Sequence, residues 1–305
     1  MNGPLPRMLL IVRAGRNSLH RAWSWSARSV VDILLSTYDG ADWSGADAHY
    51  FHVSTAAGKF PSIKQFFEQN TQFIGQYDYF WLLDDDIYIP DDSLKKILEL
   101  LRDFGFVLAQ PALSYYSFFS WPITVRNDQL LFRGTQFIEA MAPIMSRRFL
   151  ELALPHFGEN FSGWGHEWLW RHFLEQHATF AAVIDAAPIV HTRPLGTGPL
   201  YRERPADVPD AAEEMEQLLA KFGLDRAVPF RNLFGITAGP EPRLLYGDDL
   251  LSAMLSGYRE MIGHDIGAVF RCIDDLLKGG RPLITRRELS QFAGFDAMAA
   301  PFERG

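Results

Sequence analysis

The sequence predicts an α/β fold, with a mainly parallel sheet flanked by helices and a helical C-terminal region. Two observations point to this class. Strand-like and helix-like segments alternate through the first two thirds of the chain, whereas only amphipathic helices are expected beyond about residue 205. Alternation is typical of parallel sheets covered by helices, which bind ligands at the carboxyl ends of their strands. We therefore expect a sheet domain at 1–204 and a helical region at 205–305.

Apolar runs bounded by turn residues predict the strands, and apolar residues at helical spacing predict the helices. In the first half of the chain we expect strands at 8–12, 30–36, 49–53, 76–86 and 106–110, and helices at 60–69 and 93–104. Further on we expect a hairpin within 123–132, strand and turn at 136–145, helices at 147–154 and 167–176, and closing strands at 180–191. The C-terminal helices are expected at 211–222, 248–261, 266–277 and 285–292.

Composition limits the classes of function. With 305 residues, 48% of them apolar and 22% charged, the chain is an ordinary globular protein with a substantial core. A net charge of −8 argues against a nucleic-acid-binding protein, which needs a basic face. The only cysteine, Cys272, excludes an intramolecular disulfide and fits a reducing compartment. No signal peptide or transmembrane segment is expected, so we predict a cytoplasmic protein.

The most informative segment is the aromatic strand that ends in Asp84-Asp85-Asp86. Three adjacent acids repel one another, so a cation should lie against them. Because strand side chains alternate, Asp84 and Asp86 share one face and Asp85 lies on the other. Two carboxylates on one face at the carboxyl edge of a sheet suit a divalent ion that carries a phosphate. The alternative is a solvated acidic turn before the helix whose start is marked by Asp91.

A second candidate is the turn Gly163-Trp164-Gly165, followed by His166 and Glu167. Glycine on both sides frees the backbone to expose the indole, which is a natural platform for a sugar ring. Glu167 falls in the first turn of a helix and is a candidate general base. The alternative is a tight turn whose Trp164 fills the core and whose Glu167 caps the helix.

His191 and Glu139 are two weaker candidates. His191 closes a short apolar strand, and a neutral imidazole there could complete the protein ligands of a metal. A single histidine in such a place is otherwise a surface residue or a hydrogen-bonded core residue. The small residues around Glu139 could let the backbone approach a donor sugar or an acceptor, or they could simply pack.

Several motifs, in order along about residues 5–200, resemble the DUF707 family, which is grouped with GT-A-type glycosyltransferases. The C-terminal third is outside this resemblance. The motifs are Tyr77-Asp78-Tyr79 leading to Asp84-Asp85-Asp86, then Ala109-Gln110-Pro111-Ala112-Leu113, Ile138-Glu139-Ala140-Met141-Ala142-Pro143, Gly163-Trp164-Gly165, Ile184-Asp185 and Ile189-Val190-His191.

The resemblance implies a GT-A-like, Rossmann-like nucleotide-sugar-binding fold with a DxD metal motif. It implies metal residues at Asp84, Asp86 and His191. We expect Mn²⁺ or Mg²⁺ there, held by Asp86 and His191, with Asp84 in contact with the ribose or with a metal-bound water. The turn with Trp164 is similar to that of inverting galactosyltransferases, whose acid in this region is the catalytic base, here Glu167.

The expected reaction is transfer of a sugar from a nucleotide-diphosphate donor, for which a UDP-sugar is expected, to an acceptor hydroxyl. The residues expected around the donor are Arg13, Arg16, Asp39, Lys59 and Asp85. The cationic side chains would contact the phosphates, and the Asp39 carboxylate would accept a hydrogen bond from uracil or ribose. Contacts to the substrate are expected from Trp164, Gly163, Gly165, His166 and Glu139. An ordinary surface charge is the alternative for each of four of these residues: Arg13, Arg16, Asp39 and Lys59.

Two other classes remain open. A non-catalytic module that binds nucleotides or carbohydrates could have kept the metal residues without turnover. A haloacid-dehalogenase-type phosphohydrolase would use Asp84 or Asp86 as a phosphorylated nucleophile, with Gly247-Asp248-Asp249 in place of its later acidic motif. Such enzymes have small residues and a threonine after the second aspartate, whereas Ile87-Tyr88-Ile89-Pro90 follows here.

Overall fold

The structure is a computed structural model that describes residues 3–41, 43, 47–54, 56, 58–198, 208–278, 282 and 284–303. The expected boundary between residues 204 and 205 lies outside the described residues. All structural statements below concern the described part of the chain.

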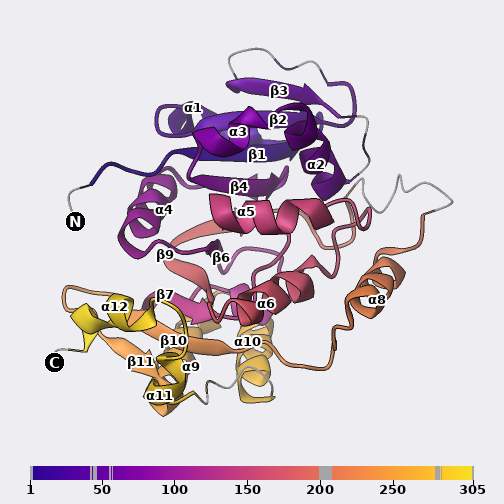
Figure 1. Ribbon diagram of the computed structural model, residues 1–305. Helices are drawn as coiled ribbons and strands as arrows, with labels where there is room; N and C mark the ends of the chain where they lie inside the picture. Colours follow the sequence, from indigo (N-terminus) through magenta and orange to yellow (C-terminus); the bar gives the residue numbers. More distant parts are fainter. Residues whose placement is uncertain are drawn as a thin grey trace.

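A large sheet runs through the molecule with helices on both faces, which confirms the mixed α/β class (Figure 1). The strand order is β11-β10-β7-β9-β6-β8-β4-β1-β2-β3, and β5 pairs with β9 outside this order. The strands are β1 (Met8–Ala14), β2 (Asp32–Thr37), β3 (Tyr50–Val53), β4 (Tyr79–Asp84), β5 (Ile87–Tyr88), β6 (Leu108–Leu113), β7 (Leu130–Thr135), β8 (Ile144–Ser146), β9 (Ala181–His191), β10 (Asn232–Thr237) and β11 (Leu244–Tyr246).

The first four strands of the chain are parallel, as the sequence predicts. Their carboxyl ends therefore meet at one edge, and the register places Arg13 of β1 between Ser36 and Asp84. Beyond β4 the sheet is mixed, because β8 returns as a short antiparallel strand between β4 and β6. The expectation of a mainly parallel sheet thus holds for β1 to β4, whereas beyond β4 the parallel pair of β6 and β9 lies among antiparallel strands.

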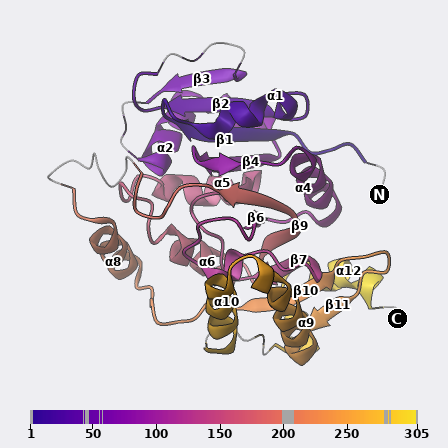
Figure 2. The ribbon, with the colours of Figure 1, turned by 180° about the vertical axis from the view of Figure 1, so that it is seen from behind.

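The helices bury apolar faces against the two sides of the sheet. Helices α2, α5 and α6 cover one side, and α1, α4, α9 and α10 cover the other (Figures 1 and 2). Side chains along β1 point alternately to the two sides of the sheet, so Leu9 and Ile11 pack in the core on the first side and Leu10 and Val12 in the core on the second. The helices are α1 (Ser24–Ala27), α2 (Lys59–Gln69), α3 (Gln72–Gln76), α4 (Asp91–Phe104), α5 (Arg147–Ala153), α6 (His166–Gln176), α8 (Ala211–Phe222), α9 (Gly247–Arg259), α10 (Ile266–Lys278), α11 (Arg286–Leu289) and α12 (Phe295–Ala299).

The start of α4 shows which of the acidic residues between 84 and 92 belong to the helix. Asp91 and Asp92 lie in the first turn of this helix, where negative charge stabilises the positive end of the helix dipole. Gly105 ends the helix with a left-handed φ of 61°. The helix-start interpretation thus applies to Asp91 and Asp92, whereas Asp84 ends β4 and Asp85 and Asp86 form the turn that precedes β5.

The prediction of an all-helical C-terminal third is wrong, because β10 and β11 belong to it. Strand β10 pairs antiparallel with both β7 and β11, so this region extends the same sheet. A Cβ at Gly235 would lie 2.8 Å from the side chain of Leu250, which shows how closely α9 packs on β10. Glycine inside so short a run hides the strand pattern.

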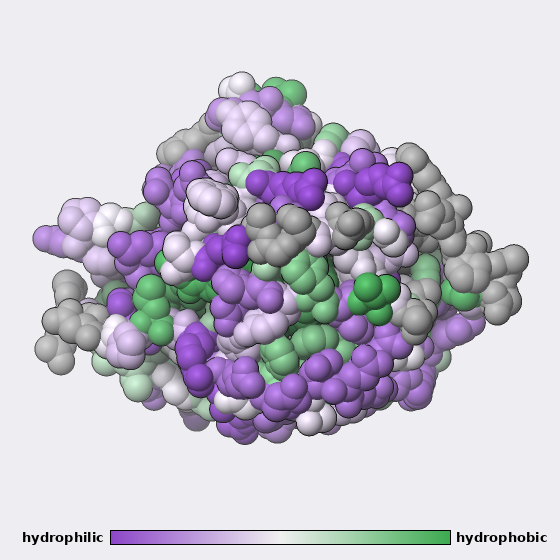
Figure 3. All heavy atoms as spheres, turned by 90° about the horizontal axis from the view of Figure 1, so that it is seen from above, coloured by the Kyte–Doolittle hydropathy of each residue, from purple (hydrophilic) through white to green (hydrophobic). Residues whose placement is uncertain are grey.

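At its other end the sheet stops at β3, which has β2 as its only neighbour in the strand order. Phe51 and Val53 of this edge strand are exposed. Seen from above in Figure 3, hydrophobic residues on the surface are broken up by hydrophilic ones. Among the described residues, no helix is both long enough and apolar enough to cross a membrane. The cytoplasmic location stays a prediction.

A buried polar cluster joins the two parts of the chain. The Arg133 guanidinium on β7 donates to both carboxylate oxygens of Asp185 on β9, each at 3.1 Å, and to the Tyr258 hydroxyl of α9 at 3.1 Å. Both charged side chains are fully buried. Because a buried charge without its partner is costly, this cluster fixes how α9 and the sheet pack together.

We expect Asp185→Ala to lower the free energy of unfolding by about 3–5 kcal/mol, because it leaves the Arg133 guanidinium buried and uncompensated. Denaturant titration measures this loss. The control is Glu216→Ala, which removes the exposed ion pair with Arg226 and should cost at most about 1 kcal/mol. Equal losses for the two variants would contradict the assigned role of the cluster.

Candidate functional site

The acidic triplet lies at the carboxyl end of β4 and in the turn that follows it. Each of the three carboxylates has a cationic group beside it, which confirms that positive charge is needed here. The pairs are Lys59 Nζ to Asp84 Oδ1 at 2.6 Å, Arg193 Nη1 to Asp85 Oδ1 at 2.6 Å, and His191 Nε2 to Asp86 Oδ2 at 3.3 Å.

Asp86 and His191 are brought together by backbone pairing. Strand β5 pairs antiparallel with the end of β9, so Ile87 lies opposite His191. The Thr192 amide and hydroxyl both donate to the Asp86 carbonyl, at 3.0 and 2.9 Å. Residues distant in the sequence are thereby held at a fixed separation.

The orientation of the His191 ring follows from its second nitrogen. Nδ1 lies 2.7 Å from the Phe118 carbonyl, which can only accept, so Nδ1 carries a proton and Nε2 faces Asp86. Burial lowers the pKa of His191, but the hydrogen bond and charge of Asp86 outweigh it and raise the pKa to about 9. A proton thus lies between Nε2 and Asp86 at neutral pH.

A metal would fit these side chains. Asp86 Oδ1 is buried and has no hydrogen-bond partner in the described structure, so it is an oxygen donor with unused capacity. Two carboxylates and an imidazole form a donor set suited to Mn²⁺ or Mg²⁺. As they stand, however, no three His, Cys, Asp or Glu side chains of the described residues form a metal-binding group. Lys59 contacts Asp84 Oδ1 and His191 Nε2 contacts Asp86 Oδ2 instead.

Asp85 lies in the turn after β4 and has a different set of partners from Asp84, although Arg193 Nη1 approaches both Asp85 and Asp86, at 2.6 and 3.9 Å. The buried Asp85 carboxylate accepts from the Gly15 amide at 3.0 Å, from the Tyr38 hydroxyl at 2.8 Å and from Arg193. These bonds anchor the loop after β1 to the acidic turn. Contact with a nucleotide stays a prediction for this residue.

The other residues expected at the donor also have internal partners. The Arg13 guanidinium donates to the carbonyls of Thr37 and Ala56, and burial lowers its pKa to about 10. Asp39 accepts from the backbone amide of Arg16 at 2.6 Å. The Arg16 residue is exposed. The structure therefore brings these residues near the first strand ends, and their nucleotide contacts stay predictions.

The tryptophan turn has the geometry that the sequence predicts. Gly163 and Gly165 have left-handed φ values of 82° and 94°, and Trp164 between them is 40% exposed. A Cβ at Gly163 would lie 2.7 Å from the Phe60 ring, so only glycine fits there without displacement. The alternative in which Trp164 fills the core is wrong for this turn. Both glycines are buried, so they contribute to the backbone conformation of the turn and are not exposed to a ligand.

Glu167 is buried at the start of α6, and both of its oxygens are held by backbone amides. Oε1 accepts from Ala140 at 3.3 Å and Oε2 from Gly165 at 3.1 Å. Burial raises the pKa of Glu167 to about 7, although these amides oppose the shift. The hydrogen bond from the Gly165 amide to Glu167 also caps the start of α6, so the alternative in which Glu167 caps the helix describes part of the geometry. A carboxyl that titrates near neutrality is suited to accept a proton in catalysis.

Glu139 shares the buried environment of Glu167. Burial, followed by the negative charge of Glu167, raises the pKa of Glu139 to about 8. The Thr124 hydroxyl lies 3.4 Å from its Oε2. Two carboxyls that repel each other in a buried site do not both ionise readily, which is consistent with the raised pKa of each.

His166 is not placed to contact a substrate, and the expectation that it would is wrong. Its side chain is fully buried, with Phe60 at 4.8 Å and Trp170 stacked at 6.0 Å between ring centroids. Neither ring nitrogen has a hydrogen-bond partner in the described structure, and burial lowers the pKa to about 3. The neutral ring serves as a core aromatic, because helical spacing turns it inward beside Trp170.

Sequence reasoning missed Arg193 and Tyr38, which hold Asp85. Arg193 follows His191 by two residues, so a basic side chain close to the histidine was the available indication. The Phe118 carbonyl, which orients His191, belongs to the irregular aromatic segment and leaves no residue-type pattern.

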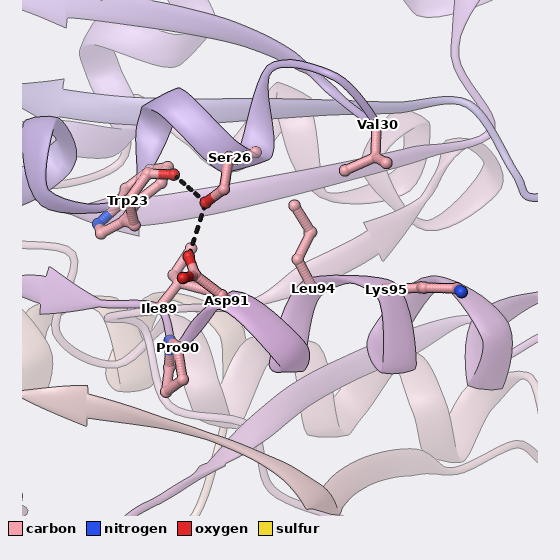
Figure 4. A pocket seen from close by; sticks show the side chains of 9 residues that line it. Trp23, Ser26, Val30, Ile89, Pro90, Asp91, Leu94 and Lys95 are labelled. Atoms are coloured by element: carbon pink, nitrogen blue, oxygen red, sulfur yellow. Dashed lines mark hydrogen bonds between the residues drawn. The ribbon is translucent and has the colours of Figure 1, made fainter.

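A small hollow between α1 and the start of α4 is a separate feature (Figure 4). Ser26 Oγ lies 2.7 Å from Asp91 Oδ1 and 3.0 Å from the Trp23 carbonyl, so its polar groups face each other. Its volume of about 110 Å³ is well below the several hundred Å³ of ordinary ligand pockets. The hollow does not include the carboxylates at the end of β4.

Comparison with known proteins gives a similarity of fold to solved structures. A scan against models of protein families and a search of curated proteins each find no match. Among solved structures, the chain is similar to GalNAc-T7 in a crystal structure with UDP, GalNAc and Mn²⁺, with a TM-score of 0.47 and 10% sequence identity. The similar region covers 66% of this chain and 48% of that one, so the chain spans about half the length of that protein.

Proposed function

We propose that this chain is a metal-dependent glycosyltransferase that moves a sugar from a nucleotide-diphosphate donor to an acceptor hydroxyl. The expected donor is a UDP-sugar. The observation that most supports this proposal is the contact of Asp86 with His191 beside Asp84, at the end of a parallel strand. The motifs that resemble the DUF707 family give the second support.

Asp84, Asp86 and His191 would hold Mn²⁺ or Mg²⁺ through carboxylate oxygens and Nε2. A bound divalent cation neutralises negative charge that develops on the departing diphosphate. The free Oδ1 of Asp86 supports this assignment, as does the fixed tautomer of His191. Deprotonation of Nε2 would make its lone pair available.

Glu167 would act as the general base. As the acceptor oxygen forms its bond to the anomeric carbon, the bond from that carbon to the diphosphate oxygen breaks, and the acceptor proton passes to the Glu167 carboxylate. A base opposite the leaving group gives inversion at the anomeric carbon. The amides of Ala140 and Gly165 hold the carboxylate in one orientation for this transfer.

Trp164 would support the acceptor or donor sugar, because its indole is exposed on a rigid turn. The turn is held from below by Glu214 of α8, whose carboxylate accepts from the amides of Phe161 and Ser162 at 2.7 and 2.8 Å. An aromatic ring fixed in this way can stack on the apolar face of a sugar.

A phosphohydrolase of the haloacid-dehalogenase type is less well supported. Its later acidic motif would be Gly247-Asp248-Asp249, which begins α9. This helix packs on β10 and β11, at the end of the strand order farthest from the first strands. A non-catalytic binding module would share the metal residues, and it is distinguished by the experiments below.

We expect one nucleotide sugar to raise the melting temperature in the presence of Mn²⁺. At a ligand concentration 100 times the dissociation constant, the stabilisation is about 2.7 kcal/mol, which corresponds to a shift on the order of 5 °C. A panel of UDP-, GDP- and TDP-sugars, each with and without Mn²⁺, provides the measurement. If no donor shifts the transition at millimolar concentration with Mn²⁺, the proposal fails.

We expect Glu167→Gln to reduce kcat by about 10²–10⁴-fold, because the amide cannot accept the proton. Binding of the donor should be retained, as measured by the same thermal shift. The matched control is Glu213→Gln, which changes an exposed glutamate in the first turn of α8. Full activity of Glu167→Gln would remove Glu167 from the mechanism, and donor binding by an inactive wild type would favour the binding module.

We expect the wild-type kcat/KM to increase as the pH rises through about 7. Burial raises the pKa of Glu167 to about 7, and only its deprotonated form can accept a proton. A bound cation adds positive charge, so the inflection should lie at or below this pH. Rates from pH 5.5 to 8.5 at saturating Mn²⁺ test this, and a rate that falls across the range would contradict it.

A further inference from the structure

We infer that Lys59 is a built-in counter-ion of Asp84 that competes with a divalent cation for this carboxylate. The inference rests on the proposed function and adds a role for Lys59 other than contact with phosphate. In the absence of a metal ion, Lys59 neutralises the charge of Asp84, and a bound metal ion would replace it as the counter-ion.

The contacts of the Lys59 ammonium are complete. Nζ lies 2.6 Å from Asp84 Oδ1, 2.5 Å from the Ala140 carbonyl and 3.1 Å from the Met141 carbonyl. An ammonium has three N–H groups, so each one has an acceptor. The Lys59 side chain is only 9% exposed, whereas that of Asp84 is 41% exposed and open to an incoming ligand.

The fold gives Lys59 little choice of position. It is the first residue of α2, and it follows Gly58, which has a left-handed φ of 83°. A Cβ at Gly58 would lie 2.2 Å from the Phe161 carbonyl, so the backbone passes very close to the tryptophan turn. This close approach directs the Lys59 side chain toward the end of β4.

Competition follows from the charges. A divalent cation bound by Asp84 would meet the positive charge of Lys59 beside the same carboxylate, and like charges at such separation repel strongly in a partly buried site. Without Lys59, Asp84 and Asp86 would also repel each other more, and a divalent cation would relieve that repulsion. Both effects predict that loss of the Lys59 charge tightens metal binding.

Lys59 also connects the metal residues to the proposed base. The Ala140 carbonyl accepts from Lys59, and the amide of the same residue donates to Glu167 Oε1 at 3.3 Å. One residue of the loop before β8 therefore contacts both groups. Lys59 is a positioning residue in this arrangement, since it acts through Asp84 and through Ala140.

The test is the dissociation constant of Mn²⁺, without nucleotide, for the wild type and for Lys59→Met. Titration calorimetry, or the electron paramagnetic resonance signal of free Mn²⁺, gives this constant independently of activity. We expect Lys59→Met to bind Mn²⁺ more tightly, by a factor on the order of ten. Lys59→Arg keeps the charge and should stay close to the wild type.

Lys64→Met is the matched control. Lys64 lies on the same helix and donates to the Pro155 carbonyl, away from the carboxylates, so its loss should leave Mn²⁺ binding unchanged. If Lys59→Met does not fold, as judged by circular dichroism, Lys59→Gln removes the charge with a polar side chain in its place.

The outcomes separate the two proposals. If the wild type binds Mn²⁺ and the uncharged variants bind it equally or more weakly, Lys59 is only a structural support and this inference is overturned. If neither the wild type nor an uncharged variant binds Mn²⁺ at millimolar concentration, the proposed metal site itself fails. Tighter binding by the uncharged variants alone supports the competition.

Discussion

Three adjacent carboxylates at the end of β4 impose the constraint on which this part of the molecule depends. Such a run is stable only where positive charge approaches each acid. The chain meets this requirement from separate segments, with Lys59 from α2, His191 from the end of β9 and Arg193 just beyond it. The parallel start of the sheet, the β5–β9 pair and the first turn of α2 are all fixed in relation to one another by these contacts.

The balance of negative and positive charge also involves the neighbouring acidic side chains. Glu139 and Glu167 lie in a buried environment that raises the pKa of each, and Glu167 is joined to Lys59 through Ala140. Under the proposed function, a positive charge gained or lost at Asp84 would act on the proposed base, Glu167, through Lys59 and Ala140. Metal binding and proton transfer would then depend on one another through these short polar contacts.

Much of this was predictable from the sequence because it depends on local patterns. Alternating apolar runs indicated the strands and helices of the first two thirds, and the repulsion among Asp84, Asp85 and Asp86 required cations. The identity of those cations was not predictable, since it depends on how far long side chains reach across the fold. Strand β10 was missed because Gly235 interrupts a short run. His166 was misplaced because it was assigned with the exposed turn before it, although its spacing from Leu169, Trp170 and Phe173 places it on the buried side of α6.

The cluster of Arg133, Asp185 and Tyr258 has a consequence for folding during synthesis. Strand β7 and its arginine leave the ribosome well before α9, and the pairing partner β10 also comes later. Until then the nascent sheet has an open edge at β7, and the guanidinium lacks the phenol that completes its surroundings. An unpaired strand edge of this kind can pair with other chains until β10 has been synthesised and covers it.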